Sequence, residues 1–416
     1  MEDGRLLELM EWIVEAGLDG ASETDLVDGF CRRLVEHGVP LTRVVVGIDT
    51  LHPVLEARMF HWHRTKNETT ASEYTRSSSR ENEEKWLKSP FFYLLDSGQR
   101  SLRCRFVDGD CPSDRFPVLG DLRDEGITDY LAISTPFGKP ITIGLMDSLA
   151  SSWSTDSPEG FGDGQVRLME RTLPFLALAI RDVSVGRITE TLVETYLGRD
   201  AGRRVLGGYI ERGVTERMSA VLWFSDLQGF TRITDTVPPE QVIPLLNDYA
   251  DAIVSSIHER QGQVLKFMGD GIMAIFSGAG DGELCNRALD AAEEAKRRVI
   301  DLNKRRKAES LPWTRFYLGL NVGEVFYGNI GSEDRLDFTV IGPAVNEVSR
   351  IAAMCRSLDQ DVLLSSSFAN TAEACSARLV SVGRYALRGV GRPQELFTLD
   401  PEAAVGKETA CVRPAG

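Results

Sequence analysis

VLWFSDLQGFT, at Val221–Thr231, is the stretch on which the interpretation of the chain depends. Apolar, β-prone residues lead up to Asp226, so its carboxylate is expected where a strand ends. A second apolar stretch, VLKFMGDGIMAIF at Val264–Phe276, places Asp270 between two glycines, which is typical of a tight hairpin turn. Two carboxylates at neighbouring strand ends repel each other unless a cation lies between them. The pair therefore predicts a divalent metal site, because Mg²⁺ sites often combine one or two carboxylates with substrate phosphates; two ordinary turn aspartates are the alternative.

Two further segments add groups suited to a phosphate ester. Gly229–Thr231 follows the first carboxylate at a probable helix start, where backbone N–H groups can bind phosphate. VIGPAVNEVSR, at Val340–Arg350, places Asn346 and Arg350 four residues apart, on one face of a helix. A guanidinium stays charged and offers a fixed fork of donors, which suits it to phosphate; a surface ion pair is the alternative for Arg350.

These motifs, together with the K-F-x-G-D-G hairpin and a C-terminal L-R-G-x-G, resemble the class III nucleotidyl cyclase catalytic domain over Ser219–Leu399. The resemblance implies an α+β fold with a ferredoxin-like core, which the alternation of strands and helices also fits. It further implies that two Mg²⁺ or Mn²⁺ ions assist attack of a 3′-hydroxyl on the α-phosphorus of a nucleoside triphosphate. A homodimer would share each site between its two protomers.

The resemblance also gives each matching residue a role. The metal would be bound by Asp226, by the carbonyl of Leu227 and by Asp270. The phosphates would be bound by Gly229, Phe230, Thr231 and Arg388, and the base by Lys266 and Thr339. Asn346 would bind the ribose, and Arg350 would contact the α-phosphate. Arg392 is the alternative to Arg388 for the terminal phosphates.

The base is expected to be adenine. Lys266 can donate to N1 of adenine, and the Thr339 hydroxyl can accept from N6, whereas guanine presents the reverse pattern. Many adenylate-forming relatives carry Asp where this chain has Thr339, and the Thr form resembles the class IIIb subgroup. The prediction is thus an adenylate cyclase that converts ATP to 3′,5′-cyclic AMP and pyrophosphate. Cyclisation of GTP or a pyrimidine nucleotide, or a catalytically silent cyclase-like module, are the alternatives.

Composition places limits on the other functions of the chain. The chain has 416 residues, 42% of them hydrophobic, and a formal net charge of −15, which argues against general binding of nucleic acid or anionic membranes. Its sequence contains no apolar run long enough to span a bilayer and no signal-peptide pattern, so a cytoplasmic protein is expected. Seven cysteines without CxxC spacing are interpreted as reduced thiols, with a Cys104–Cys111 pair as the less favoured alternative.

The first part of the chain resembles a GAF-type sensory domain in layout alone. Its expected elements are helices at Leu6–Leu18, Glu23–His37 and Asp163–Val183 and strands at Arg43–Asp49, Glu56–His63, Asp129–Pro136 and Ile141–Met146. The resemblance implies a regulatory domain for an unidentified effector. His61 and His63 share one strand face, which suggests either a metal or haem feature or an ordinary half-buried strand.

The expected domains are therefore a GAF-like domain at 1–183, a helical connector at 184–217, the catalytic domain at 218–400 and a flexible tail at 401–416. Gly198 and Gly207–Gly208 are expected to interrupt the connector as a hinge. Within the catalytic domain, Gly323 is expected to split one β-prone run into two strands.

Overall fold

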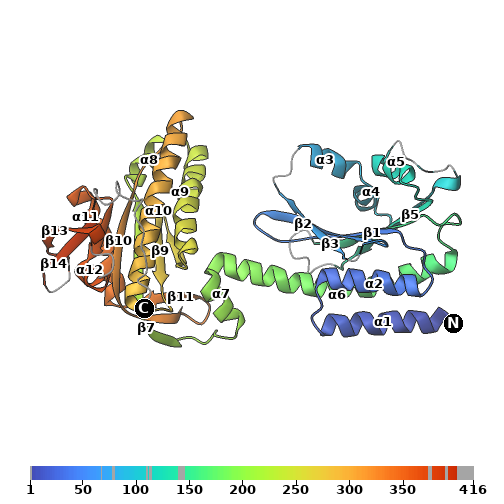
Figure 1. Ribbon diagram of the computed structural model, residues 1–416, viewed down its shortest axis with the longest axis horizontal. Coiled ribbons are helices and arrows are strands. Elements are labelled where there is room, and N and C mark those ends of the chain that lie inside the picture. The colour runs from blue at the N-terminus through green and yellow to red at the C-terminus, as the bar shows by residue number, and fades with distance from the viewer. Residues whose placement is uncertain are drawn as a thin grey trace, which may run out of the picture. The chain divides into compact units, whose positions relative to one another are not determined.

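The chain divides into two compact units, Met1–Leu192 and Val193 onward (Figure 1). The computed structural model describes residues 2–66, 68–76, 80–108, 111, 115–138, 146–372, 377–388 and 392–400. Among these residues, no helix is both long enough and apolar enough to cross a membrane. Each unit is built around its own sheet and its own buried core.

The first unit contains a six-stranded antiparallel sheet in the order β3-β2-β1-β6-β5-β4. Its strands are β1 (Arg43–Asp49), β2 (Leu55–His63), β3 (Thr70–Thr75), β4 (Ser101–Arg105), β5 (Asp129–Pro136) and β6 (Ser148–Thr155). Strands β1, β5 and β6 each contain a run of buried residues, as expected for a sheet that is covered by helices, although four of the buried residues in β6 are Ser or Thr.

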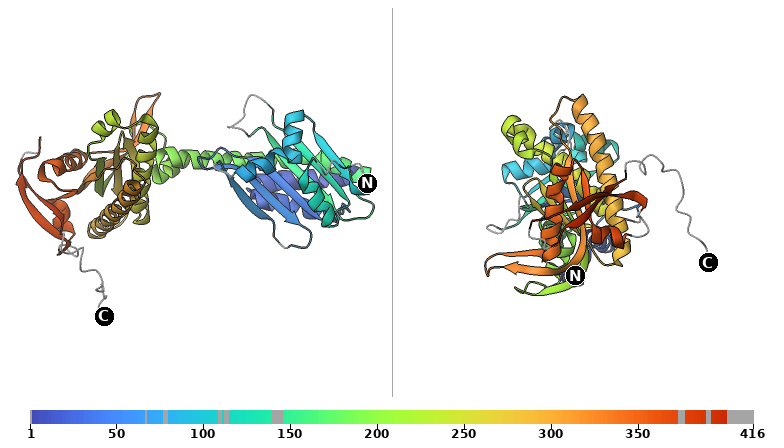
Figure 2. Two further views of the ribbon diagram at one scale, coloured as in Figure 1. Left: turned by 90° about the horizontal axis from the view of Figure 1, so that it is seen from above. Right: turned by 90° about the vertical axis from the view of Figure 1, so that its left-hand side faces the viewer.

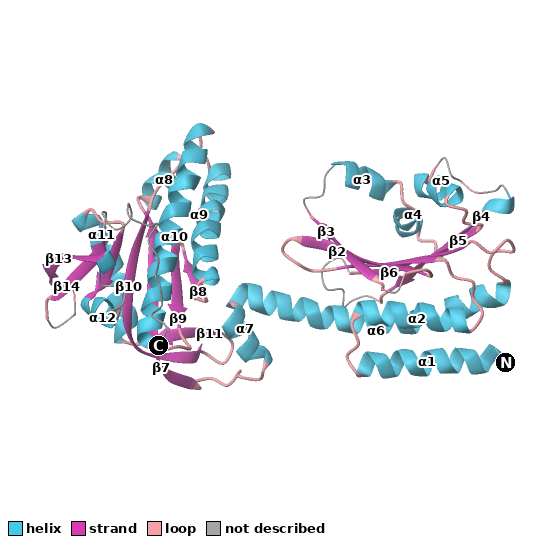
Figure 3. Ribbon diagram, in the orientation of Figure 1, coloured by secondary structure: helices cyan, strands magenta, loops and turns pink. Residues whose placement is uncertain are grey.

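Helices cover both faces of this sheet (Figure 3). One face carries α1 (Glu2–Leu18), α2 (Glu23–Glu36) and the first part of α6 (Asp163–Leu197); the other carries α3 (Arg80–Leu87), α4 (Pro90–Ser97) and α5 (Pro117–Asp124), with a short 3₁₀ helix at Phe106–Asp108 after β4. Ser22 caps α2 because its hydroxyl accepts a hydrogen bond from the Asp25 N–H at 3.2 Å. An α+β domain at the N-terminus is therefore confirmed, whereas its GAF-like character stays a prediction.

Two sequence-based expectations for this unit need correction. The strands that pair with β5 are β4 and β6 (Ser148–Thr155), whereas Ile141–Met146 was expected as its partner; residues 141–145 of that segment lie outside the described residues. Cys104 and Cys111 form a disulfide, so the interpretation of all cysteines as reduced thiols is wrong. The Cα atoms of Cys104 and Cys111 lie 5.2 Å apart, within the normal range for a bridge.

The second unit begins within α6, and a short helix follows before its first strand. Gly198, with φ of 85°, separates α6 from α7 (Arg199–Leu206), and Gly207 ends α7. A Cβ at Gly198 would lie 2.7 Å from the carbonyl oxygen of Val264, so only glycine fits there. The break expected at these glycines is present, and α7 packs on the sheet of the second unit through the buried Ala201.

The sheet of the second unit contains the ferredoxin-like order β10-β7-β9-β8, extended beyond β10 by β12, β14 and β13 (Figures 1 and 2). Its strands are β7 (Thr215–Leu227), β8 (Gln263–Met268), β9 (Gly271–Phe276), β10 (Phe316–Gly331), β11 (Leu336–Ile341), β12 (Val362–Ser365), β13 (Leu379–Tyr385) and β14 (Gln394–Leu399); its other helices are α8 (Phe230–Thr236), α9 (Pro239–Glu259), α10 (Asp281–Ala308), α11 (Pro343–Leu358) and α12 (Ser366–Thr371). Helices α9 and α10 bury one face of the sheet, while α7 and α11 contribute to a second cluster.

Gly323 does not split β10, contrary to expectation. The strand pairs with β7 without interruption from Phe316, opposite Leu227, to Gly328, opposite Thr215. A Cβ at Gly323 would lie 2.8 Å from the Cβ of Ala344, so this glycine allows α11 to approach the strand closely. The close approach fixes α11, which carries the expected ribose and phosphate residues, against the sheet.

Candidate active site

Asp226 and Asp270 lie side by side, as the sequence predicts. Asp226 is the next-to-last residue of β7, and Asp270 occupies the turn between β8 and β9. Strand β9 pairs with β7, so the turn comes next to the end of β7. The Leu227 N–H donates a hydrogen bond to Oδ2 of Asp270 at 3.1 Å, which fixes the second carboxylate beside the first.

Two glycines make this arrangement possible. Gly269 has φ of 67°, a conformation that residues with a side chain rarely adopt. A Cβ at Gly271 would lie 3.2 Å from the carbonyl oxygen of Met268 and 3.7 Å from Oδ1 of Asp226. The Gly-Asp-Gly sequence therefore allows both the tight turn and the close packing of the turn against the carboxylate of Asp226.

The electrostatics of the pair suit a divalent cation. Burial and the neighbouring Asp270 carboxylate raise the pKa of Asp226 to about 7, because two like charges in one site resist ionisation together. A bound Mg²⁺ or Mn²⁺ would remove that repulsion. No group of three or more His, Cys, Asp or Glu side chains gathers at a possible metal site in the described ranges. Water, the Leu227 carbonyl and substrate phosphates would therefore complete the coordination, which is how Mg²⁺ is commonly held.

The segment after Asp226 forms a tight connection into α8. Gly229 precedes this helix with φ of 66°, and Phe230 and Thr231 form its first turn. The first N–H groups of a helix have no partner within it and are available to an anion. Gln228, which the sequence analysis did not single out, donates from its side-chain amide to the Tyr317 hydroxyl at 2.8 Å. Tyr317 lies opposite Asp226 in the pairing of β10 with β7. The sequence gives no signal for this tyrosine, because its position depends on the register of the two strands.

Lys266 forms an ion pair with Asp337, a residue that the sequence analysis missed. Asp337 and Thr339 are two residues apart on β11, so their side chains point to the same face of the strand. The structure thus brings Lys266 of β8 next to the strand that carries Thr339. The i, i+2 spacing of Asp337 and Thr339 is the one signal in the sequence that could have pointed to Asp337.

Asn346 and Arg350 occupy one side of α11, four residues apart, as expected. Asn346 is exposed and Arg350 is half-buried. Within the described residues, Arg350 forms no ion pair, so the alternative of a helix-surface ion pair finds no support in this part of the chain. Its guanidinium is therefore available to an anionic ligand.

Arg388 and Arg392 are both exposed and follow β13, with residues 389–391 outside the described part of the chain. Leu387, beside Arg388, is 4% exposed and packs with α11 through Ile351. Arg388 therefore directly follows a residue that is anchored against the helix of Arg350, which favours it over Arg392 as a phosphate ligand; its assignment stays a prediction.

Residues 214–400 match the family model for the adenylate and guanylate cyclase catalytic domain. An uncharacterized protein of Mycobacterium tuberculosis (strain CDC 1551 / Oshkosh) is 31% identical over 210 residues, which are 49% of this chain and 36% of that protein. An uncharacterized protein of Mycobacterium bovis is also 31% identical over 210 residues, or 38% of its length. The chain thus matches little more than a third of the length of these relatives.

Solved cyclase structures resemble the same part of the chain. The adenylyl cyclase CyaB from Pseudomonas aeruginosa is 24% identical with a TM-score of 0.41 and covers 45% of this chain and 96% of its own. The guanylyl cyclase Cya2 is 28% identical with a TM-score of 0.40 and covers 44% of this chain and 93% of its own. The family-model match and the four motifs cover the same part of the chain, so residues 214–400 are similar to the adenylate and guanylate cyclase catalytic domain.

Proposed function

We propose that the second unit is an adenylate cyclase, which converts ATP to 3′,5′-cyclic AMP and pyrophosphate. The observation that carries this proposal is the Asp226–Asp270 pair, held by the Leu227 N–H at the end of β7. When bound, two divalent ions would lower the pKa of the 3′-hydroxyl and neutralise charge on the phosphates. The chain itself would hold the triphosphate with the N–H groups of Gly229–Thr231 and with Arg388.

Arg350 and Asn346 supply the remaining catalytic contacts in this proposal. The Arg350 guanidinium would stabilise the charge that grows on the α-phosphate, because it stays ionised and forms no ion pair within the described residues. Asn346 would orient the ribose so that its 3′-oxygen lies in line with the leaving pyrophosphate. Both residues are placed by α11, which the close approach at Gly323 holds against β10.

Adenine is the proposed base because Lys266 is a donor and Thr339 carries a hydroxyl acceptor. The ion pair with Asp337 holds the Lys266 ammonium at β11, near the strand position of Thr339. A cationic donor suits N1 of adenine and opposes the N1–H of guanine. Because Thr is a weaker discriminator than Asp at this position, turnover of GTP is the principal alternative.

We further propose that the active unit is a homodimer. As the family resemblance implies, one protomer would contribute Asp226 and Asp270, and its partner would contribute the residues that bind the base, the ribose and the α-phosphate. One chain carries both sets, so a two-fold dimer would build two equivalent sites. ATP as substrate would place this activity in the cytoplasm.

The first unit is proposed to regulate the second through a small molecule. A cavity of about 560 Å³ lies between β1, β2, β5 and β6 of its sheet and helices α3, α4 and α5, a size common for ligand sites. His61 lines this cavity, and its Nε2 forms a hydrogen bond with the Ser72 hydroxyl at 2.8 Å, whereas His63 pairs with Thr65. The two histidines therefore have separate partners, which favours a ligand cavity over a shared metal.

A nucleotide panel tests the proposed reaction. The purified protein is incubated with ATP, GTP, CTP or UTP and Mn²⁺, and cyclic products and pyrophosphate are quantified by chromatography. We expect cyclic AMP and pyrophosphate in equal amounts, with ATP turned over faster than the other three nucleotides. A faster rate with GTP would reassign the base, and the absence of any cyclic product would contradict catalysis.

A further inference from the structure

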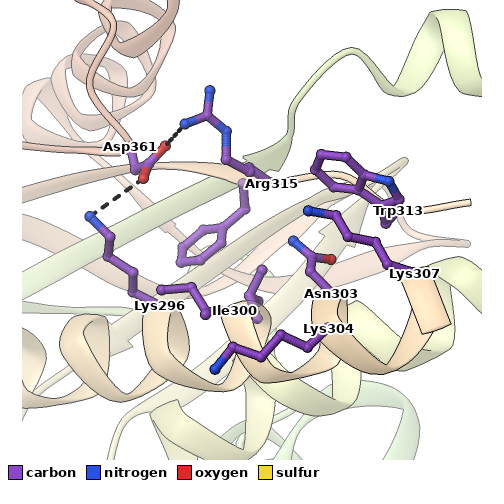
Figure 4. Close-up of a pocket in the computed structure, with 10 residues that line it drawn as sticks. Lys296, Ile300, Asn303, Lys304, Lys307, Trp313, Arg315 and Asp361 are labelled. Atoms are coloured by element: carbon purple, nitrogen blue, oxygen red, sulfur yellow. Dashed lines mark ion pairs between the residues drawn. The ribbon is translucent and has the colours of Figure 1, made fainter.

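A second cavity, of about 320 Å³, lies in the catalytic unit on the side of α10 that faces the start of β10 (Figure 4). Its lining residues come from the last turns of α10, the start of β10 and the residue before β12: Lys296, Val299, Ile300, Asn303, Lys304, Lys307, Trp313, Arg315, Phe316 and Asp361. None of these residues has a role in the proposed reaction.

The cavity is cationic although the chain as a whole is acidic. Four cationic side chains line it, and Asp361 is the one carboxylate among the lining residues. Asp361 is shared between Lys296 and Arg315, each at 3.4 Å, and Lys304 pairs with Asp301 at 2.8 Å, so Lys307 is the one lining cation without an ion pair among the described residues. Basic residues are favourable at a helix C-terminus, which accounts for part of this charge. The formal charge of the chain is −15, so a local excess of positive charge at a cavity favours an anionic ligand.

One wall of the cavity is aromatic and open to solvent. Trp313 is 47% exposed and Ile300 is 48% exposed, so both present apolar surface at the rim. The Lys307 ammonium lies 3.7 Å from the centroid of the Trp313 ring, and within the described part of the chain it forms no ion pair. Figure 4 shows both side chains at the same end of the cavity. A planar ring beside an ammonium is the arrangement that would bind a second planar ring carrying an acid.

We propose that this cavity is a regulatory site for a small aromatic anion, a planar ring that bears a carboxylate or a phosphate. The ring would pack against Trp313 and Ile300, and the acidic group would bind Lys307, because Lys304 already pairs with Asp301 at 2.8 Å. The volume matches the lower end of the range for small-molecule sites. A neutral aromatic compound lacks the charge contact, and inorganic phosphate lacks the ring contact.

The site is connected to the metal-binding carboxylates through one hydrogen-bonded segment. Nε of Arg315 donates to Oε1 of Gln228 at 3.0 Å, and the Gln228 N–H donates to the Arg315 carbonyl at 2.8 Å. Gln228 directly follows Leu227, whose N–H holds Asp270. A ring that packs against Trp313 would act two residues along the chain from Arg315, and through Arg315 on the segment that fixes the carboxylate pair. This regulatory step rests on the proposed metal site, whereas binding of the anion does not.

Binding is tested with four probes on the full chain: 2-naphthoate, 1-naphthyl phosphate, neutral 2-naphthamide and inorganic phosphate. The indole N–H signal of Trp313 is followed by NMR, and affinity is measured by calorimetry. We expect one or both aromatic acids to bind at least about tenfold more tightly than 2-naphthamide or inorganic phosphate. Whichever of the two aromatic acids binds more tightly identifies carboxylate or phosphate as the preferred group. Equal binding of 2-naphthamide would overturn the proposal, because it would show a general apolar surface.

Two variants and two matched controls locate the site. Trp313→Leu and Lys307→Gln should each weaken binding at least about fivefold, since each removes one of the two contacts. Trp86→Leu and Lys66→Gln change an exposed tryptophan and an exposed lysine of the first unit and should leave affinity unchanged. Circular dichroism confirms that all four variants fold. Unchanged affinity in both cavity variants would overturn the assignment.

Regulation is tested by titrating Mn²⁺ with and without the tighter aromatic acid, using electron paramagnetic resonance. We expect the acid to change the Mn²⁺ affinity of the wild-type chain at least about twofold and to have no effect on Trp313→Leu. A bound acid that leaves Mn²⁺ affinity unchanged would overturn the regulatory step alone. A chain that binds the acid but no Mn²⁺ would instead overturn the proposed function and, with it, the regulatory step.

Discussion

Each unit of the molecule contains a carboxylate whose pKa is raised, and the two differ in what surrounds them. Burial, with Asp270 beside it, raises the pKa of Asp226 to about 7. Burial, with Asp147 and Glu56 nearby, raises the pKa of Asp49, at the end of β1, to about 6. The guanidinium of Arg76 offsets part of the second shift, whereas no cationic side chain among the described residues contributes to the first.

The difference shows that a raised pKa does not by itself identify a catalytic carboxylate. The Asp226–Asp270 pair lies between a glycine turn and a helix start, where backbone N–H groups are available to phosphate. Asp49 instead has the exposed guanidinium of Arg76 nearby and lies opposite Ala57 in the strand register. We therefore propose a metal at the first site and only a cost in stability at the second.

The largest expected effect separates the two sites by activity. Asp226→Asn or Asp270→Asn should lower nucleotide turnover at least about a hundredfold, because each removes charge that the proposed metal ions require. Asp49→Asn should leave turnover within about twofold of wild type. Initial rates with ATP and saturating Mn²⁺ measure all three. Near-normal activity of either catalytic-unit variant would contradict the assignment.

Mixing two inactive variants tests whether the carboxylate pair works with residues of a second protomer. Neither Asp226→Ala nor Asn346→Ala homodimers would have a complete site. Free exchange would make half of the dimers mixed, each with one intact site of two, so activity should return to about a quarter of wild type. An inactive mixture that contains mixed dimers by native mass spectrometry would contradict the shared site.

A smaller effect is expected at the ion pair of the catalytic unit. Lys266→Glu replaces a donor with an acceptor beside Asp337, so the ratio of ATP to GTP turnover should fall about tenfold to a hundredfold. Asp337→Asn keeps the Lys266 donor and should preserve the preference for ATP. Competition assays with both nucleotides measure the ratio. An unchanged ratio in Lys266→Glu would place this residue outside the base pocket.

The smallest effect concerns stability and belongs to the first unit. The pKa of Asp49 is raised in the folded state. Its favourable contribution to the free energy of unfolding is therefore complete below the ordinary pKa of 3.8 and is lost as the pH rises through about 6. Asp49→Asn should therefore stabilise this unit at pH 8 by about 1–2 kcal/mol and have little effect at pH 4. Scanning calorimetry at both pH values measures the difference, with the exposed Asp96→Asn as control. Equal stabilisation at both pH values would show that ionisation is not the cause.

Much of the catalytic fold could be predicted because its signals are local. The apolar run before Asp226, the Gly-Asp-Gly turn and the spacing of Asn346 and Arg350 each specify one element within a few residues. The interruption at Gly198 was also predicted correctly, because a left-handed glycine breaks a helix without help from distant residues.

The features that could not be predicted depend on contacts between distant segments. Gly323 resembles a strand break in sequence, and only its contact with Ala344 shows that it accommodates a helix. Asp337 is 71 residues from Lys266, so their ion pair follows from the placement of β11 and not from spacing. In the first unit, the partner of β5 and the disulfide of Cys104 likewise require the three-dimensional arrangement.

Binding of Mn²⁺ without nucleotide tests most directly whether the two acidic sites differ as described. Electron paramagnetic resonance titrations compare the wild-type chain with Asp226→Asn, Asp270→Asn and Asp49→Asn under identical conditions. We predict that either catalytic-unit variant weakens Mn²⁺ binding at least about tenfold, whereas Asp49→Asn binds like wild type. Equal affinity in all four proteins, or a loss only in Asp49→Asn, would contradict the assignment of the metal to Asp226 and Asp270.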